Sequence, residues 1–292
     1  MPEFDTAVRI AGGIPVRMDS TVESLVWTVN GQVDVLESIL DTNPQLKWVQ
    51  LPWAGIDAFS HLLDRRVTFT SAKGAYREPV AEHALMLCMA MGRKLPERAK
   101  ATEWGEKFAV SLYDANVVIV GGGGIAQELA MLLQPFRANV TVVRRTASPL
   151  VGVNVTVTID RLDEVLPDAD FVVLANALTP ETRGMFDMRR FELMNPKAYL
   201  VNVARGGVVV TDDLLAALDA KLLAGAALDV TDPEPLPRGH AAWGRNNLLI
   251  TPHTADTPVQ VTRLFAERIQ VNVSALIGNT SFVGLVDKSL GY

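Results

Sequence analysis

Three short segments of the sequence each carry one side chain suited to proton transfer. Each segment lies at or just after the end of a predicted strand, on the side where a doubly wound sheet binds ligands. Taken singly, each side chain also has an ordinary explanation: a surface cation beside a glycine turn, an exposed loop carboxylate, or a histidine at a strand end. Together, an arginine, a carboxylate and an imidazole at successive strand ends predict a proton-transfer set. The segments are 202–207 with Arg205, 227–235 with Glu234, and 249–255 with His253.

A glycine-rich turn upstream of these segments predicts a dinucleotide site. An apolar run, residues 117–120, leads into small residues at G-x-G-x-x-A spacing, and a helical segment, residues 127–133, follows. Such a turn lets the backbone approach a pyrophosphate at a helix N-terminus. A flexible glycine turn in an ordinary α/β domain is the alternative. The turn is formed around Gly121, Gly123 and Ala126, and the residues predicted to bind the cofactor are Gly121, Gly123, Gly124 and Ile125.

The next predicted strand, residues 139–143, indicates which dinucleotide binds. An NAD site of this type places an acidic side chain about 20 residues after the turn, on the ribose hydroxyls. Here the strand ends in Arg144 and Arg145, and no acidic residue occurs between Glu128 and Asp160. Two guanidinium groups suit the 2′-phosphate of NADP, whereas a solvated basic turn is the structural alternative. We therefore predict NADP as the cofactor, with NAD as the second choice.

Composition argues against several classes of protein. The 292 residues have a net charge of −6 and no long basic run, which argues against nucleic acid or an anionic membrane as the main partner. Hydrophobic residues make up 49%, enough for sizeable cores. Cys88 is the only cysteine, so an internal disulfide is impossible, and no cluster of residues has the spacing of metal ligands. Without a signal peptide or an apolar run that spans a bilayer, we predict a soluble cytoplasmic protein.

The order of the elements predicts an α/β protein of two domains. From residue 106 on, short valine-rich runs alternate with helical patterns, as parallel βαβ units require. We predict a doubly wound parallel (Rossmann) sheet in a dinucleotide-binding domain, residues 99–264, and a smaller flavodoxin-like α/β substrate domain, residues 1–98 and 265–292. The predicted strands are 22–28, 46–51, 116–120, 139–143, 154–158, 170–174, 198–203, 225–229 and 247–250, and the predicted helices are 33–40, 79–91, 127–133, 160–166, 188–194, 212–223 and 262–276.

From about residue 45 to the C-terminus, the sequence resembles the D-isomer-specific 2-hydroxyacid dehydrogenase family. Several ordered motifs at fitting distances are far more specific than any one of them. The resemblance implies a homodimeric oxidoreductase that interconverts a small 2-keto acid and a D-2-hydroxy acid by hydride transfer. The matching motifs are Ala54–Asp57, Val80–His83, the glycine turn, Leu178–Gly184, the segments of Arg205, Glu234 and His253, and Leu285–Tyr292.

The resemblance also implies a role for each matching residue. Arg205 would hold the carbonyl oxygen and carboxylate of the substrate with its planar fork. His253 would be the general acid in reduction, and Glu234 would accept from its other ring nitrogen and favour the imidazolium. The remaining implied roles are carboxylate binding by the main-chain amides of Ala54 and Gly55, a contact of Asp229 with the carboxamide side of the nicotinamide, and cofactor contacts of Leu178 and Thr179.

Some positions depart from the family pattern or leave alternatives open. Arg144 stands where the NAD-using members have Asp, which points to members similar to glyoxylate/hydroxypyruvate reductases. Residues 175–177, Ala-Asn-Ala, replace the family's usual loop. Trp53 either forms a wall of the substrate pocket or packs in a core. His83 is expected to make contacts between domains.

Two other functions remain open from the sequence. The same fold serves a dinucleotide-sensing, corepressor-like binding protein, although the complete Arg205, Glu234 and His253 set favours catalysis. A dehydrogenase of a phosphorylated or amino-acid-pathway acid would need further basic residues near Ala54. The candidates for these are Lys73 and Arg77.

Overall fold

The computed structural model describes residues 1–29 and 31–288, which form two compact units. The first unit consists of Met1–Tyr76 and Thr257–Tyr292, and the second of Arg77–Asp256. Helix α3 (Arg77–Gly92) thus belongs to the second unit, whereas the predicted limits of the domains, at 98 and 265, stay a prediction. The last four residues of the motif Leu285–Tyr292 lie outside the described residues.

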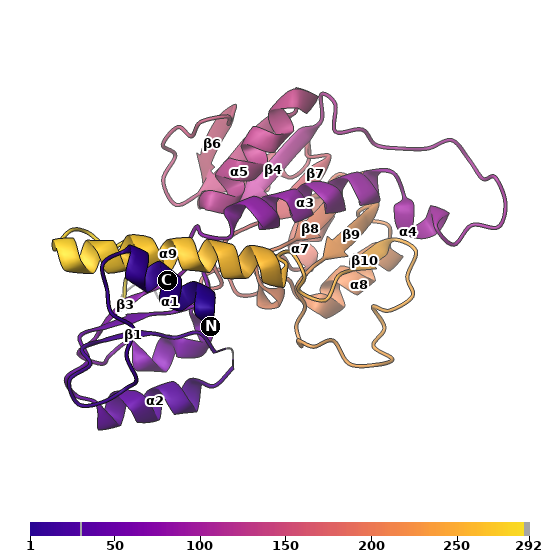
Figure 1. The fold of residues 1–292 in the computed structure, drawn as a ribbon. Coiled ribbons are helices and arrows are strands. Elements are labelled where there is room, and N and C mark those ends of the chain that lie inside the picture. The colour runs from indigo at the N-terminus through magenta and orange to yellow at the C-terminus, as the bar shows by residue number, and fades with distance from the viewer. Residues whose placement is uncertain (30, 289–292) are drawn as a thin grey trace. The chain divides into compact units, whose positions relative to one another are not determined.

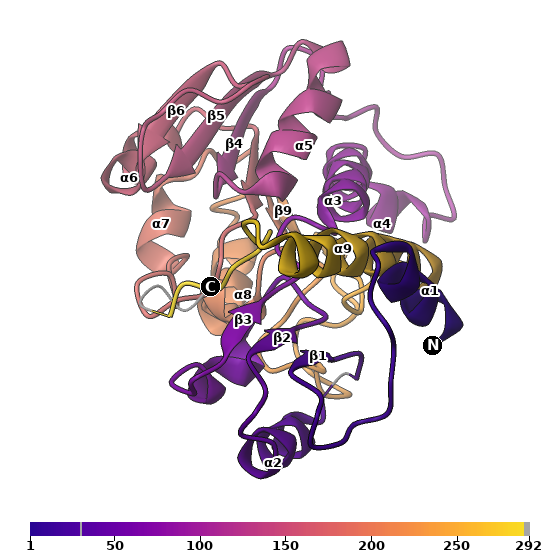
Figure 2. The same ribbon diagram turned by 60° about the vertical axis from the view of Figure 1, so that its left-hand side comes forward.

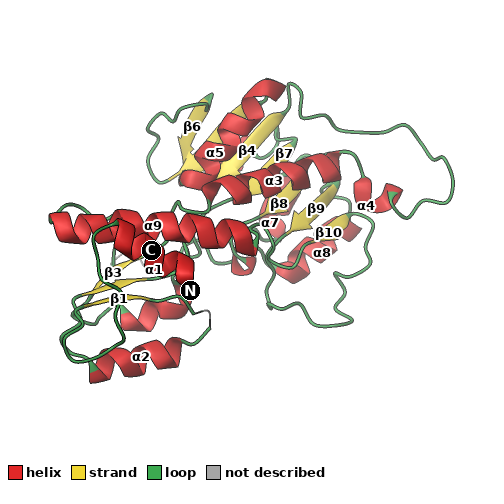
Figure 3. Ribbon diagram, in the orientation of Figure 1, coloured by secondary structure: helices red, strands yellow, loops and turns green. Residues whose placement is uncertain are grey.

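Seven parallel strands form the sheet of the second unit, in the order β10-β9-β8-β7-β4-β5-β6 (Figures 1 and 3). The chain starts at β4, runs outward to β6, returns to β7 and runs outward again to β10. This is the order of a doubly wound Rossmann sheet, with its switch point between β4 and β7, and it confirms the predicted fold class. The strands are β4 (Asn116–Val120), β5 (Asn139–Arg144), β6 (Val155–Thr158), β7 (Phe171–Leu174), β8 (Tyr199–Asn202), β9 (Gly225–Leu228) and β10 (Leu248–Ile250).

Helices cover both faces of this sheet, which explains why its strands are continuous apolar runs. In β4, Val117 and Ile119 pack into one core with α3 and α5 (Gly124–Leu133). Val118 and Val120 face the opposite core, to which three further helices contribute. Figure 2 shows α5 beside β4. The helices of the opposite core are α6 (Leu162–Val165), α7 (Met188–Leu193) and α8 (Thr211–Asp219), and the short α4 (Leu95–Arg98) follows α3.

The first unit is a smaller α/β layer built on three parallel strands. Its sheet has the order β1-β2-β3, and buried side chains such as Leu36, Val49 and Phe69 form its core. Helix α1 and strand β3 were not predicted from the sequence. The elements are α1 (Pro2–Ile10), β1 (Ser24–Val26), α2 (Val33–Thr42), β2 (Trp48–Gln50), β3 (Thr68–Thr70) and α9 (Pro258–Gly278).

The C-terminal helix α9 returns to the first unit through buried polar contacts. Arg268 donates from Nη1 to Ser71 O and from Nη2 to Lys73 O, both at 2.8 Å. Asn272 donates to Gln50 Oε1 at 2.7 Å in the interior. Because these bonds satisfy buried polar groups, they fix the helix against the strands of this unit.

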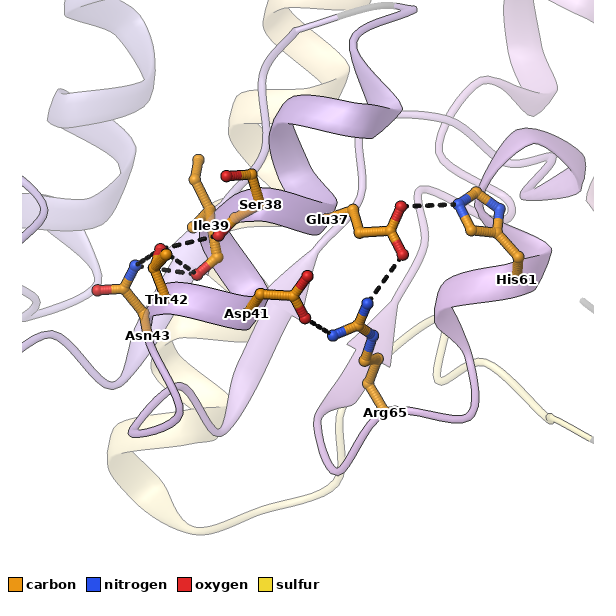
Figure 4. A network of polar contacts seen from close by, with 8 residues as sticks. All are labelled: Glu37, Ser38, Ile39, Asp41, Thr42, Asn43, His61 and Arg65. Atoms are coloured by element: carbon orange, nitrogen blue, oxygen red, sulfur yellow. Dashed lines mark hydrogen bonds and ion pairs between the residues drawn. The ribbon is translucent and has the colours of Figure 1, made fainter.

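A surface network of ion pairs joins α2 to the segment before β3 (Figure 4). Arg65 donates to Glu37 at 2.8 Å and also pairs with Asp41. His61 lies 3.8 Å from Glu37, and its side chain is half exposed. Exposed pairs of this kind contribute little stability, so we assign the network no chemical role.

Candidate active site

The three segments of the predicted proton-transfer set lie at one edge of the second unit's sheet. Strands β8, β9 and β10 are parallel neighbours, so their carboxyl ends lie side by side. Arg205 follows β8, Glu234 follows β9, and His253 follows β10. Since β4 belongs to the same parallel sheet, the glycine turn at its carboxyl end lies at this edge too. The structure thus places the turn and the three side chains where a doubly wound sheet binds ligands.

The carboxylate of Glu234 and the ring of His253 form a hydrogen-bonded pair. Glu234 Oε1 lies 2.6 Å from His253 Nδ1, and Oε2 accepts from the main-chain N–H of Thr231 at 3.3 Å. The side chains of His253 and Glu234 are 49% and 41% exposed. Because an ionised carboxylate can only accept, Nδ1 carries a proton, and Nε2 is the nitrogen left to exchange a proton with a ligand.

The backbone of His253 adopts an uncommon conformation, held by two hydrogen bonds. Its φ is 52°, in the left-handed region that residues other than glycine rarely occupy. Its N–H donates to Asp229 O at 2.8 Å and to Thr251 O at 3.0 Å. Such a conformation persists where the surroundings determine it, so the strand ends of β9 and β10 together fix the position of the ring.

The buried carboxylate of Asp229 fastens the same turn. Its Oδ1 accepts from Thr251 Oγ1 at 2.6 Å and from the N–H of Thr254 at 3.0 Å. Its Oδ2 accepts from the N–H of Ala255 at 3.3 Å. Burial raises the pKa of Asp229, but hydrogen bonds from His83, Thr251 and Thr254 outweigh it, so the pKa lies below its ordinary value. Asp229 therefore remains ionised at neutral pH, at the place where the resemblance predicts a cofactor contact.

Arg205 is held in place by a buried amide and by a glycine. Asn202 donates from Nδ2 to Arg205 O at 3.0 Å. A Cβ on Gly206 would overlap the carbonyl of Thr231, so only glycine allows the two segments to come this close. The Arg205 segment is thus packed against the segment that leads to Glu234.

Each glycine of the predicted phosphate turn has a different environment. Gly121 has a φ of 112°, and a Cβ there would lie 2.6 Å from Ala175 O. A Cβ on Gly122 would lie 2.7 Å from Cδ of Arg144, whereas a Cβ on Gly123 would meet no atom within 4 Å. Gly121 is required by its positive φ and by the backbone of Ala175, and Gly122 leaves room for the side chain of Arg144. The third borders open space, where a phosphate can approach the backbone.

Helix α5 offers its N-terminus directly after this turn. Gly123 is the N-cap and provides no side chain to cap the helix. The first helical bond runs from the N–H of Gln127 to Gly123 O at 3.1 Å. The N–H groups of Gly124 and Ile125 therefore have no acceptor within the helix. Together with the positive end of the helix dipole, they suit the pyrophosphate of a dinucleotide.

The loop after β7 leaves one polar atom of the protein without a partner. Asn176 follows Ala175, whose carbonyl abuts the glycine turn. Its Nδ2 donates to Ala177 O at 3.0 Å, but its buried Oδ1 accepts no hydrogen bond from any residue that the structure describes. A buried acceptor of this kind is unfavourable unless a donor reaches it. Its place beside the turn fits a donor group of a bound dinucleotide.

Leu178 and Thr179 continue this loop toward the Arg205 segment. A Cβ on Gly207 would lie 3.3 Å from Cδ2 of Leu178, so this side chain packs beside that segment. The N–H of Thr179 donates to Thr182 Oγ1 at 2.7 Å. The two predicted cofactor residues thus lie in an ordered loop between the glycine turn and Arg205.

Arg144 and Arg145 lie next to the glycine turn, at the end of β5. Strands β4 and β5 are paired, with Val120 opposite Val143. Arg144 is half-buried and its side chain lies along Gly122, while Arg145 is exposed. Arg144 therefore belongs to the strand beside the phosphate turn, and Arg145 directly follows that strand.

Ala54 and Gly55, the predicted substrate-binding residues, belong to the first unit. They lie in the loop after β2, with Ala54 exposed and Gly55 half-buried. The preceding Trp53 accepts at its main-chain oxygen from Ala72 N–H at 2.9 Å, and its ring lies 5.9 Å from that of Tyr76. Its Nε1 is buried without an acceptor among residues 1–29 and 31–288.

Two titratable residues of this region had no role in the sequence-based site. His83, expected at a contact between domains, has a partner within the second unit, with Nε2 3.0 Å from Thr251 Oγ1. Asp256 follows the His253 turn. Burial raises its pKa above the ordinary value, although His253 opposes this effect and Asp229 adds to it. In the sequence, only the motif Val80–His83 pointed to His83, and this motif does not indicate which residue the imidazole contacts.

Two structural features are absent from the part of the chain that the structure describes. No cluster of His, Cys, Asp and Glu there is arranged to hold a metal ion, and no helix there is long and apolar enough to cross a membrane. Burial raises the pKa of the Cys88 thiol to about 12, so this residue stays a protonated core side chain.

The chain is similar to a family of dehydrogenases and to relatives named as reductases. Residues 84–255 match the family described as D-isomer specific 2-hydroxyacid dehydrogenase, NAD binding domain. The chain is 30% identical over 268 residues to a glyoxylate reductase of Pyrococcus furiosus, covering 87% of this chain and 79% of that protein.

Two solved structures resemble the whole chain. One is a D-isomer specific 2-hydroxyacid dehydrogenase from Xanthobacter autotrophicus Py2 in complex with NADPH and MES, with a TM-score of 0.86, 28% identity, and coverage of 100% of this chain and 96% of that one. The other is an NADPH-dependent glyoxylate/hydroxypyruvate reductase from Sinorhizobium meliloti in complex with NADP and sulfate, with a TM-score of 0.84, 27% identity, and coverage of 100% and 97%.

Proposed function

Because the chain belongs to the D-isomer specific 2-hydroxyacid dehydrogenase family, we propose that it reduces glyoxylate or hydroxypyruvate to the 2-hydroxy acid, with NADPH as the hydride donor. The family and the enzyme class predicted from the motifs are confirmed by the match of residues 84–255 and by the reductase relatives. We place the activity in the cytoplasm, because a chain whose only cysteine is Cys88 needs no oxidising compartment.

The residues around the glycine turn fit a dinucleotide. The open space at Gly123, the uncapped N-terminus of α5 and the unpartnered Oδ1 of Asn176 all lie at this turn. The main-chain N–H groups of Gly124 and Ile125 would hold the pyrophosphate, and Asp229 would accept from the carboxamide of the nicotinamide. A bound reduced nicotinamide supplies the hydride.

The pair of Glu234 and His253, joined at 2.6 Å, is the observation that carries the proposal. Nε2 of His253 donates a proton to the carbonyl oxygen of the keto acid while the carbonyl carbon gains the hydride. Glu234 orients the ring by accepting a hydrogen bond from Nδ1. Arg205 holds the carbonyl oxygen and the carboxylate of the substrate. One hydride and one proton thus give the hydroxy acid, and His253 regains its proton from water.

Arg144 and Arg145 support a preference for NADPH over NADH. A 2′-phosphate gains charge-assisted hydrogen bonds from guanidinium groups, and no acidic side chain occupies the end of β5, where an NAD site needs one. The similar proteins from Xanthobacter and Sinorhizobium were solved with NADPH and NADP, in agreement with this preference.

Two alternative functions have less support. A dinucleotide sensor needs no general acid, so the Glu234–His253 pair favours catalysis over sensing. A phosphorylated substrate would call on Arg77, but this residue already lies 3.5 Å from Glu128 Oε2 and from Glu78 Oε1.

Parallel assays of NADPH and NADH oxidation with a panel of 2-keto acids test the proposed function. We expect turnover with glyoxylate and hydroxypyruvate, and a larger kcat/KM with NADPH than with NADH. The loss of absorbance of the reduced cofactor measures both. Equal or faster turnover with NADH would contradict the cofactor preference. No turnover with any keto acid, despite binding of NADPH, would favour the sensing role.

We further propose that two copies of the chain associate through the second unit. Apolar side chains are exposed on α3 and on the segment that follows it, and that of Trp104 is 90% exposed. Apolar surface of this kind is typical of protein interfaces. Light scattering should therefore give about twice the chain mass of 31.7 kDa, and a mass of one chain would contradict the proposal. The exposed side chains are Met86, Met89, Leu95, Trp104 and Phe108.

A further inference from the structure

His83 reaches the His253 turn from the helix that packs on the sheet. It lies in α3, and its side chain is only 13% exposed. Its Nε2 lies 3.0 Å from Thr251 Oγ1 and 3.2 Å from Asp229 Oδ1. None of the roles derived above uses this buried imidazole.

The hydrogen bonds around Thr251 determine which nitrogen of His83 carries a proton. The hydroxyl of Thr251 has one proton, and it donates that proton to Asp229 Oδ1 at 2.6 Å. A hydroxyl that has donated its proton can only accept from a third group. His83 Nε2 must therefore be the donor, and it shares its proton between Thr251 Oγ1 and Asp229 Oδ1.

The two oxygens of the Asp229 carboxylate consequently differ. Oδ1 accepts from Thr251 Oγ1, from Thr254 N–H and from His83 Nε2. Among the described residues, Oδ2 receives only the N–H of Ala255, at 3.3 Å. One oxygen is thus committed to the protein, and the other retains acceptor capacity.

We propose that His83 is a positioning residue for the cofactor. By donating to Oδ1, it holds the Asp229 carboxylate in the orientation that leaves Oδ2 to accept an N–H of the nicotinamide carboxamide. This inference rests on the proposed function, because it concerns how the enzyme recognises the reactive end of its cofactor. His83 touches neither substrate nor hydride and acts through Asp229.

Binding of two cofactors that differ only in the carboxamide tests the inference. NADP⁺ has carboxamide N–H donors, whereas its 3-acetylpyridine analogue has a methyl ketone at that position. Calorimetry gives the Kd of each for the full-length protein. The wild type should prefer NADP⁺, and His83→Leu should reduce this preference about tenfold, as the loss of one hydrogen bond to a charged group would.

Two further substitutions separate positioning from packing. The side-chain nitrogen of Gln takes nearly the place of Nε2 in His, so His83→Gln should keep the preference. His83→Asn is too short to reach Oδ1 and should lose it, and this polar variant makes the same test if His83→Leu does not fold. A purely structural role would weaken both cofactors equally and leave the ratio unchanged in every variant.

An unchanged Kd ratio in both His83→Leu and His83→Asn would overturn the inference. Loss of the preference for NADP⁺ in His83→Gln would also overturn it. Failure of this inference can be told apart from failure of the proposed function, because the Kd ratio is measured without turnover. If the wild type binds NADP⁺ more tightly than the analogue but reduces no keto acid, the proposed function fails while the role of His83 stands.

Discussion

His253→Asn is expected to reduce kcat for NADPH-dependent glyoxylate reduction by about 10²- to 10⁴-fold, the usual contribution of a positioned proton donor. Asparagine keeps the main-chain N–H that donates to Asp229 O and Thr251 O, and its amide can donate to Glu234. The amide cannot release a proton to the carbonyl oxygen of the substrate. Because the ring is about half exposed and bonded chiefly to Glu234, folding and the Kd of NADPH should change little. Stopped-flow single-turnover assays and fluorescence titration of NADPH measure the two quantities separately.

His61→Asn is the matched control for this variant. His61 also lies beside a carboxylate and is half exposed, but it belongs to the surface network of the first unit (Figure 4). The kcat of His61→Asn should equal that of the wild type. If His253→Asn binds NADPH normally and also turns over at the wild-type rate, His253 is not the general acid.

The parallel sheet of the second unit could be predicted because both of its faces are buried. Strand β4 was predicted at 116–120, which are also its limits in the structure. Because both faces of the sheet are buried, the side chains of Val117–Val120 must all be apolar, whichever face they point to. Strand β3, Thr68–Thr70, has only three residues and no apolar run. Helix α1, Pro2–Ile10, buries only Phe4 and Ala7. Strand β3 is too short to show a periodicity, and α1 buries few side chains along its sequence; both pack on segments that are distant in the sequence.

In the candidate site, too, local sequence patterns could be predicted, whereas contacts between distant residues could not. Gly121 and Gly123 could be recognised because their spacing, between an apolar run and a helical segment, is a local pattern. The predicted strands placed Arg205, Glu234 and His253 at strand ends, the resemblance implied their roles, and the structure brings Glu234 and His253 into contact. Such a pattern marks which residues matter, but it does not give the hydrogen bonds between them.

The contact of His83 with Thr251 spans 168 residues of sequence. It depends on how α3 packs on the sheet, and no local pattern contains that packing. The unpartnered Oδ1 of Asn176 is likewise a property of the folded loop. Polar groups whose partners are chosen by tertiary packing are therefore the part of a site that sequence reasoning misses.

Arg144→Asp should lower kcat/KM for NADPH about 10²-fold and raise it for NADH. The substitution removes charge-assisted hydrogen bonds to the 2′-phosphate and sets a negative charge against it, and one such bond contributes about 1.5–3 kcal/mol. For NADH, the new carboxylate can accept from the ribose hydroxyls, as in NAD-dependent sites of this fold. Steady-state kinetics with both cofactors at saturating glyoxylate give the specificity ratio directly.

Arg137→Asp is the matched control for this change, because Arg137 is exposed and pairs with Asp114 just before the amino end of β5, whereas Arg144 is the last residue of that strand. It alters the net charge of the protein by the same amount as Arg144→Asp. A general electrostatic effect on a highly charged cofactor would lower the rate with NADPH in both variants, whereas recognition of the 2′-phosphate would lower it only in Arg144→Asp. An unchanged NADPH/NADH ratio in Arg144→Asp would show that the guanidinium lying along Gly122 supports the turn and does not select the cofactor.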